Sequence, residues 1–302
     1  MYKNQFHALI NQSRTWREKF STLKKIVRQT IKKGKRLRIM LIPKPPRFAG
    51  WGMTSKHFLP WDVKNSFDPT GLDFAEVDTG LLQDIEMGNF DLTQMKKNGT
   101  YVLEPSEILK TLRWRHYLVY WSAKFAIKIT KSSEINFVEA GVCDGLTINY
   151  ALSALNKEIS AKLKYMAYLY DAWSGMQAKY LTAMESGAVG SYSYLSVEQT
   201  QQNLKRFGDH CKFIKGFIPE IFQENPGPND ISWLHIDLNS SMPTKKTLEH
   251  FVPKLLSGGI VLLDDYGHGG YSETREVADK YFYDHDGLLM PLPTGQAIFF
   301  KR

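Results

Sequence analysis

The sequence has little cysteine and no long apolar run. Its 302 residues include two cysteines, Cys143 and Cys211, whose spacing suits neither a zinc site nor a disulfide framework. No stretch of 18 consecutive apolar residues occurs, and the apolar run at 39–42 is far too short for a signal-peptide core or a membrane span. We therefore expect a cytoplasmic protein that does not span a membrane.

Acidic residues are scarce near the N-terminus. Residues 1–48 carry 14 Lys plus Arg and one acid, a charge of +13, while the remaining 25 basic and 30 acidic residues give −5, which together make the net charge of +8. This basic segment has three interpretations: a solvated helix face or homo-oligomer contact, attachment at an anionic membrane surface, or nucleic-acid binding. No groove-reading module accompanies it, so nucleic acid is the least favoured partner.

The composition otherwise suits a folded protein of several parts. With 43% hydrophobic residues, the chain can bury a substantial core. The stretch PKPPRFAGWG after residue 42 ends any helix, since consecutive prolines remove hydrogen-bond donors and clash with the preceding turn. We predict a basic helical segment at 1–48, an irregular region at 49–105 that includes the loop-like stretch FDPTGLDFAEVDTG, and a larger domain at 106–302.

Apolar runs and helical patterns alternate in the larger domain, which calls for a parallel sheet with helices on both faces. Strands are predicted at 135–140, 165–170, 211–215, 232–237 and 259–263. Helices are predicted at 105–129, 146–157, 176–184, 196–207, 243–256 and 272–283. The C-terminal stretch LLMPLPTGQAIFFKR has two short apolar runs around Thr294 and Gly295, which indicates a hairpin with a last strand antiparallel to its neighbour.

A glycine-rich turn follows the first strand in FVEAGVCDGLT. Gly141 and Gly145 permit a tight turn and a close approach of backbone to a ligand, with a helix N-terminus behind them. Glu139 precedes the first glycine, and an acid there would repel a pyrophosphate but suits a ligand with an ammonium group and hydroxyls. Asp171 ends the second strand, where an acid typically accepts from ribose hydroxyls. A purely structural turn and a solvated strand-end acid are the alternatives.

Together with the terminal hairpin, these features resemble the class I S-adenosylmethionine-dependent methyltransferases. That resemblance implies an α/β fold with a Rossmann-like seven-stranded methyltransferase sheet, in which only the last strand is antiparallel, here preceded by the helical basic N-terminal extension. It also implies that Glu139, Gly141, Gly145 and Asp171 hold S-adenosylmethionine.

Three carboxylates stand where two apolar runs stop. Asp237 ends the fourth predicted strand, and Asp264 and Asp265 end the fifth. Adjacent strands lie about 4.8 Å apart, so side chains at the same ends can converge on one ion. Crowded carboxylates perturb one another's protonation unless a cation compensates them, and hard oxygen ligands suit Mg²⁺. The alternative is that these acids merely cap a strand and begin a loop.

A narrower resemblance covers about residues 106–302. The stretch from HIDLNSSMP through PKLLSGGIVLLDDYG, with LRWRHYLVYW and DAWSGM before it, is similar to the macrocin O-methyltransferase family, magnesium-dependent enzymes that methylate sugar hydroxyls in natural products. The resemblance implies that Asp237, Asp264 and Asp265 are metal ligands. It also places Asn239 where the family has an Asp proposed as general base.

An asparagine in that position leaves the general base open. The amide of Asn239 has no carboxylate to accept a proton and can only hydrogen-bond or ligate weakly. His268, three residues after Asp265, could take the proton instead, and so could His235, which by period two shares a strand face with Asp237. The bland alternatives are a solvated loop residue for His268 and a core residue for His235.

The favoured function is therefore S-adenosylmethionine- and Mg²⁺-dependent O-methylation of a saccharide or glycosylated small molecule. Two other functions are weighed beside it. A metal-independent methyltransferase acting on another hydroxyl acceptor is favoured if Asn239 weakens the metal site. A non-catalytic, membrane-associated scaffold that kept the fold predicts no cofactor binding at all.

Overall fold

The computed structural model describes residues 71–92, 104–130, 132–158, 164–268 and 270–302. The predicted basic segment at 1–48 lies outside these residues, as does most of the region predicted at 49–105. Interpretations of that segment as a membrane or oligomer contact therefore stay predictions. Among the described helices, none combines the length and apolar character needed to cross a membrane.

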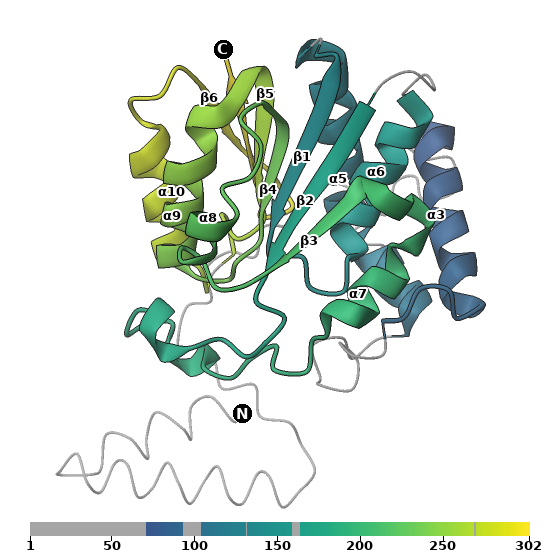
Figure 1. Ribbon diagram of the computed structural model, residues 1–302, viewed down its shortest axis with the longest axis horizontal. Coiled ribbons are helices and arrows are strands. Elements are labelled where there is room, and N and C mark those ends of the chain that lie inside the picture. The colour runs from purple at the N-terminus through teal and green to yellow at the C-terminus, as the bar shows by residue number, and fades with distance from the viewer. Residues whose placement is uncertain (1–70, 93–103, 131, 159–163, 269) are drawn as a thin grey trace, which may run out of the picture. The chain divides into compact units, whose positions relative to one another are not determined.

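A seven-stranded sheet forms the centre of the described domain (Figure 1). Its strands are β1 (Glu134–Ala140), β2 (Lys164–Asp171), β3 (Cys211–Lys215), β4 (Ile231–Ile236), β5 (Leu255–Leu263), β6 (Gly287–Pro291) and β7 (Ala297–Lys301). They are ordered β3-β2-β1-β4-β5-β7-β6. Strands β1 to β5 pair in parallel, whereas β7 runs antiparallel to both of its neighbours. The predicted sheet with a reversed last strand is confirmed.

Helices cover the sheet on two faces. On one side lie α3 (Gly71–Glu86), α5 (Pro105–Thr130) and α6 (Leu146–Glu158), and on the other α8 (Ile221–Glu224), α9 (Ser241–Phe251) and α10 (Ser272–Phe282), as Figure 1 shows. Because the parallel strands are covered on both faces, every residue of β4 is buried rather than every second one. Two apolar cores result, one against each face of the sheet.

Two predictions of local structure differ from the structure. Residues 71–86, expected to be irregular, form α3, whose Phe74 and Leu81 are fully buried and which packs on α5 and α6. Phe74 and Leu81 recur at helical spacing, but the five acids of the helix and Gly80 conceal the pattern. The helix expected at 176–184 is reduced to a 3₁₀ turn, Ala178–Tyr180, while the one expected at 196–207 divides into α7 (Val197–Asn203) and a 3₁₀ segment, Lys205–His210.

Candidate active site

A cleft of about 430 Å³ opens at the carboxyl ends of the parallel strands. Its lining comes from the segments that follow β1, β2, β3, β4 and β5, including the first turns of α6 and α9, together with Leu112 and Arg115 of α5. Ligands of open α/β sheets bind at this edge because the loops there leave room above the strand ends. Most of the candidate residues lie in this cleft, but three do not line it, namely Glu139, Gly145 and His235.

The glycine-rich turn approaches the end of the neighbouring strand. Gly141 has a φ of +88°, and a Cβ added there would lie 1.8 Å from the carbonyl oxygen of Asp237, so no side chain fits. Gly145 also has a positive φ, +87°, and a Cβ there would press against Leu204 at 3.1 Å. Both positions require glycine. Only Gly141 presents its backbone to the cleft.

Asp171 organises the same turn. Its Oδ2 accepts hydrogen bonds from the backbone N–H groups of Val142 and Cys143, both at 2.8 Å, and its Oδ1 accepts from the N–H of Trp173 at 2.7 Å. Burial raises the pKa of Asp171, although these backbone donors favour the charged form and oppose the rise. The carboxylate therefore links the end of β2 to the glycine turn of β1 while lining the cleft.

Glu139 is directed away from the cleft. Its side chain is fully buried, and Oε1 lies 2.7 Å from Nδ1 of His235 on the adjacent strand. Glu139, predicted to hold the cofactor, therefore does not line the cleft, because its side chain lies on the face of the sheet where its register partner on β4, His235, is beside it. Burial raises the pKa of Glu139, and the nearby His235 opposes that rise.

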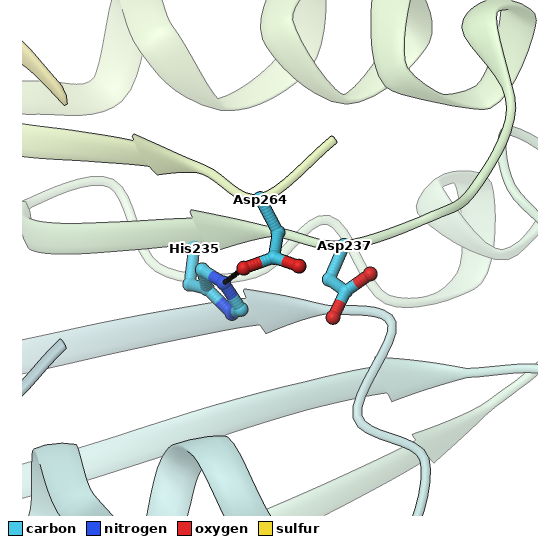
Figure 2. Close-up of side chains that lie close together, drawn as sticks. All are labelled: His235, Asp237 and Asp264. Carbon is cyan, nitrogen blue, oxygen red and sulfur yellow. Dashed lines mark ion pairs between the residues drawn. The ribbon is translucent and has the colours of Figure 1, made fainter. Parts of the chain in front are cut away.

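The two strand ends bring the predicted carboxylates together. Asp237 follows β4, and Asp264 and Asp265 follow β5, its neighbour in the sheet. In Figure 2, the side chains of Asp237 and Asp264 lie side by side, with His235 beside Asp264. One donor atom each from His235, Asp237 and Asp264 lies within 4.8 Å of the other two. Asp265 is turned toward the next loop, where its Oδ2 accepts the backbone N–H of Asn239 at 2.7 Å.

A residue not predicted for the site, Arg115 of α5, reaches between two of these carboxylates. Its Nη2 donates to Asp237 Oδ2 and its Nε donates to Asp264 Oδ1, both at 2.8 Å. The side chains of Arg115, Asp237 and Asp264 are 17%, 21% and 9% exposed, respectively, so these charge-assisted hydrogen bonds are largely shielded from water. Arg115 falls on the apolar stripe of α5 between Ile108 and Val119, and a charge at such a core position requires a buried counter-charge.

One arginine does not balance all of this negative charge. Burial and the charge of Asp264 raise the pKa of Asp237 to about 7, although Arg115 opposes the rise. Burial, together with Asp237 and Asp264, also raises the pKa of Asp265 well above its usual value. Burial likewise disfavours the charged form of Asp264, but Arg115 and His235 outweigh it and hold that pKa below its usual value. Arg115 therefore does not fully compensate the negative charge of the three carboxylates.

His235 lies beneath the cluster rather than in the cleft. It is fully buried between Glu139 and Asp264, and its Nε2 lies 3.9 Å from Asp264 Oδ1. Burial alone would lower the pKa of His235, but the two carboxylates raise it to about 9. Since His235 does not line the cleft, the structure does not place it where it could take a proton from an acceptor bound there.

Asn239 has a structural reason to be an amide. It has a φ of +53°, a conformation that asparagine tolerates better than most residues, and its Nδ2 donates to Asp237 Oδ1 at 3.2 Å. Its Oδ1 accepts from the hydroxyl of Tyr271 at 2.6 Å. A carboxylate here could not donate to Asp237 and would add like charge beside Asp265. The amide thus binds the cluster together while facing the cleft.

His268 is the predicted histidine that does face the cleft. It is exposed, and it lies against the terminal hairpin, where a Cβ added to Gly295 would come within 2.8 Å of its Nε2. Tyr271 follows it on the same loop and also lines the cleft, and burial with the nearby aspartates raises the pKa of this phenol to about 12. A hydroxyl that stays protonated donates hydrogen bonds but is a poor base at neutral pH.

The segment between β2 and α7 closes the other side of the cleft. Backbone bonds join Met176 N–H to Ser191 carbonyl and Gly190 N–H to Met176 carbonyl, both at 2.9 Å. Glu185 on this segment accepts the N–H of Ser241 at the start of α9, at 2.7 Å. These bonds tie the segment to the scaffold that carries the carboxylates.

Known proteins are similar to this chain in fold. Residues 138–266 match a family described as a methyltransferase domain. A search of curated protein sequences finds no match. The structure is similar to that of the O-methyltransferase NovP, with 16% identity over 76% of this chain and 99% of NovP, and a TM-score of 0.56. It is also similar to CalS11, a calicheamicin methyltransferase, with 15% identity over 79% of this chain and 98% of CalS11, and a TM-score of 0.45.

The superposition on NovP decides the fold class. The chain has the Rossmann-like methyltransferase fold. The predicted methyltransferase class is thereby confirmed at the level of fold, and the matching domain supports an enzyme that transfers methyl groups. The narrower resemblance to the macrocin O-methyltransferases stays a prediction, as do the roles of the individual residues.

Proposed function

We propose that this protein is an S-adenosylmethionine-dependent O-methyltransferase whose acceptor is a hydroxyl of a saccharide or glycosylated small molecule. The observation that carries the proposal is the cleft itself. One cavity joins the glycine turn and Asp171 to the carboxylate cluster, so a methyl donor and a hydroxyl acceptor can lie side by side in it. Methyl transfer then needs mainly alignment of the acceptor oxygen with the sulfonium methyl, which such an arrangement provides.

The cofactor half of the cleft has suitable chemistry. Backbone N–H groups hold the carboxylate of Asp171 in place, and the same carboxylate lines the cleft, where its oxygens can accept from a ribose hydroxyl. The apolar side chains of Met176, Tyr180, Phe217 and Ile218 line the same cavity and suit a flat purine ring. Gly141 admits the donor close to the backbone, whereas Gly145 supports the turn from behind.

The acceptor half is polar. Asn239, Tyr271 and His268 line it together with the carboxylates, and such a mixture of donors and acceptors suits a ligand with several hydroxyls. We assign the proton-accepting role to His268, because a neutral imidazole in the cleft can take the hydroxyl proton, while Asn239 cannot and His235 lies outside it. Substitution of His268 by Gln should lower kcat far more than it changes the affinity for cofactor.

A divalent cation would fit at the carboxylate cluster. Asp237, Asp264 and Asp265 would hold it, since carboxylate oxygens suit Mg²⁺ and two of these acids have raised pKa values that a cation would lower. When bound, it would lower the pKa of the acceptor hydroxyl beside it. The chain's own residues keep the carboxylates in place: Arg115 bridges Asp237 and Asp264, and Asn239 hydrogen-bonds to both Asp237 and Asp265.

Arg115 also favours a second candidate, a metal-independent O-methyltransferase. Its guanidinium already supplies a positive charge between Asp237 and Asp264, both at 2.8 Å. In that case the acceptor would be oriented by Asn239, Tyr271 and His268 without an ion. The two candidates share the cofactor site and differ in their response to chelator.

Binding and turnover separate these functions. S-adenosylhomocysteine should raise the melting temperature of the full chain, and this rise should be lost when Asp171 is replaced by Ala. Methyl transfer from labelled S-adenosylmethionine to a panel of nucleotide sugars and glycosides is then measured with Mg²⁺ and with a chelator. Transfer that persists in chelator supports the metal-independent enzyme. If S-adenosylhomocysteine does not change the melting temperature, both enzyme functions are wrong and the non-catalytic scaffold remains.

A further inference from the structure

One tyrosine enters the cleft from the segment between β2 and α7. Tyr192 lines the cleft, and its backbone has a φ of +65°, in the left-handed region that bulky residues rarely adopt. Backbone strain of this kind persists only where the surrounding structure holds it, and it gathers at functional sites. The strain at Tyr192 therefore points to a function for the side chain that it directs into the cleft.

The segment holds this tyrosine from both sides. Before it, the N–H of Gly190 donates to the carbonyl of Met176, and the N–H of Met176 donates to the carbonyl of Ser191, both at 2.9 Å. After it, the N–H of Leu195 donates to the carbonyl of Tyr192 at 3.1 Å, and the Leu195 side chain is buried in the core. A side chain fixed in this way loses little conformational freedom when a ligand binds beside it.

The phenol of Tyr192 lies where the two halves of the cleft meet. Burial raises the pKa of Tyr192 far above its usual value, and Asp237, Cys143 and Asp265 add to the rise, so the phenol is close to both the glycine turn and the strand ends. The turn and the end of β4 touch at this point, since a side chain at Gly141 would collide with the carbonyl oxygen of Asp237. Among the described residues, none forms a hydrogen bond with the Tyr192 hydroxyl.

We propose that the hydroxyl of Tyr192 contacts the sulfonium group of S-adenosylmethionine, and that this contact makes the cleft select the charged methyl donor over its uncharged product. The inference rests on the proposed function, because a donor held by the glycine turn must direct its methyl group across this junction to reach an acceptor. Asp237 and Asp265 attract the hydroxyl hydrogen, so the lone pairs of the oxygen are directed to the opposite side, toward the donor.

The contact depends on the charge of the ligand. A sulfonium polarises the C–H bonds of its methyl group, and such bonds form weak C–H···O contacts with an oxygen lone pair. S-adenosylhomocysteine is an uncharged thioether without that methyl group, so it lacks this contact while its nucleoside and amino-acid parts are unchanged. Sinefungin carries an ammonium group in place of the sulfonium, and its N–H can donate a stronger, charge-assisted hydrogen bond to the same oxygen.

Calorimetric titration of the full chain with these three ligands, without acceptor, tests the proposal. Tyr192→Phe keeps the ring and removes only the oxygen, so the variant should fold. It should weaken sinefungin at least about tenfold and S-adenosylmethionine about fivefold, while S-adenosylhomocysteine changes less than about twofold. The matched control is Tyr194→Phe. Tyr194 lies on the same segment, with its ring centroid 6.4 Å from that of Tyr192, but it does not line the cleft and should change none of the three affinities.

The outcomes separate the inference from the function on which it rests. If Tyr192→Phe weakens all three ligands by the same factor, the phenol supports the cleft without recognising charge, and if it weakens none of them, the contact does not exist. Either result overturns the inference alone. If none of the three ligands binds to the unaltered chain, the proposed function is wrong and the inference falls with it.

Discussion

Replacement of Arg115 by Met tests whether one arginine holds the carboxylate cluster together. The variant keeps a long apolar stem on the buried stripe of α5 but removes the two charge-assisted bonds to Asp237 and Asp264. Breaking a buried ion pair typically costs about 3 to 5 kcal/mol. The partial exposure of Arg115 and Asp237 places this case near the lower limit, about 3 kcal/mol at pH 8.

The cost should depend on pH in a defined direction. The pKa of Asp237 in the fold, about 7, lies above its unfolded value near 3.9, so the folded state takes up a proton between these values as pH falls. At pH 8 the carboxylates of Asp237 and Asp264 are both charged and repel each other in the Arg115→Met variant. At pH 5.5 Asp237 is neutral, so this repulsion is relieved. We therefore expect a loss of about 1 kcal/mol at pH 5.5 against about 3 kcal/mol at pH 8.

Thermal unfolding at the two pH values measures this difference. A loss of about 3 kcal/mol corresponds to a fall of roughly 6 to 12 °C in melting temperature for a domain of this size. Arg113→Met is the matched control, because Arg113 lies two residues earlier on α5 and forms a longer, more exposed ion pair with Asp78 at 3.3 Å. If the Arg115 variant melts no lower than the Arg113 variant, or loses equal stability at both pH values, the guanidinium is not the counter-charge of the cluster.

Three other substitutions test separate parts of the site. Asp237→Ala should reduce methyl transfer by at least about 100-fold while leaving S-adenosylhomocysteine affinity within about threefold, measured by initial rates and calorimetry; equal loss of both would reassign this residue to the cofactor. Asp171→Asn replaces one of the two accepting oxygens by an NH₂ group, which cannot accept from a backbone N–H. The free energy of unfolding in urea should therefore fall by about 2 kcal/mol, and the affinity for S-adenosylhomocysteine should fall about tenfold. Asp144 is buried, its Oδ2 has no hydrogen-bond partner among the described residues, and burial raises its pKa to about 7, so its contribution to stability falls as pH rises from about 4 to 7. Asp144→Asn should therefore stabilise the protein by up to about 4 kcal/mol at pH 8 and by little at pH 4. Equal stabilisation at the two pH values would show that Asp144 carries no destabilising buried charge.

Local pattern was enough to predict most of the fold. Strands β1 to β5 were predicted from short, mostly apolar runs between helical patterns, the glycines at 141 and 145 mark the turn after β1, and the C-terminal hairpin was visible around Gly295. Helix α3 was missed because its apolar residues are spread among acids, and only the packing of Phe74 and Leu81 on α5 and α6 makes the helix stable.

By itself, the sequence predicted that Asp237 and Asp264 lie close together, because the carboxyl ends of neighbouring parallel strands share one edge of the sheet. Asp265, expected to join them, is turned toward Asn239. Only the tertiary structure decided which side chains contact these carboxylates. Arg115 reaches Asp237 across 122 residues and Asp264 across 149, while Glu139 turns from the cleft to His235 across 96. Those contacts depend on how α5 lies over the sheet and on which strand faces which, and no local periodicity encodes the choice of a partner so distant along the chain.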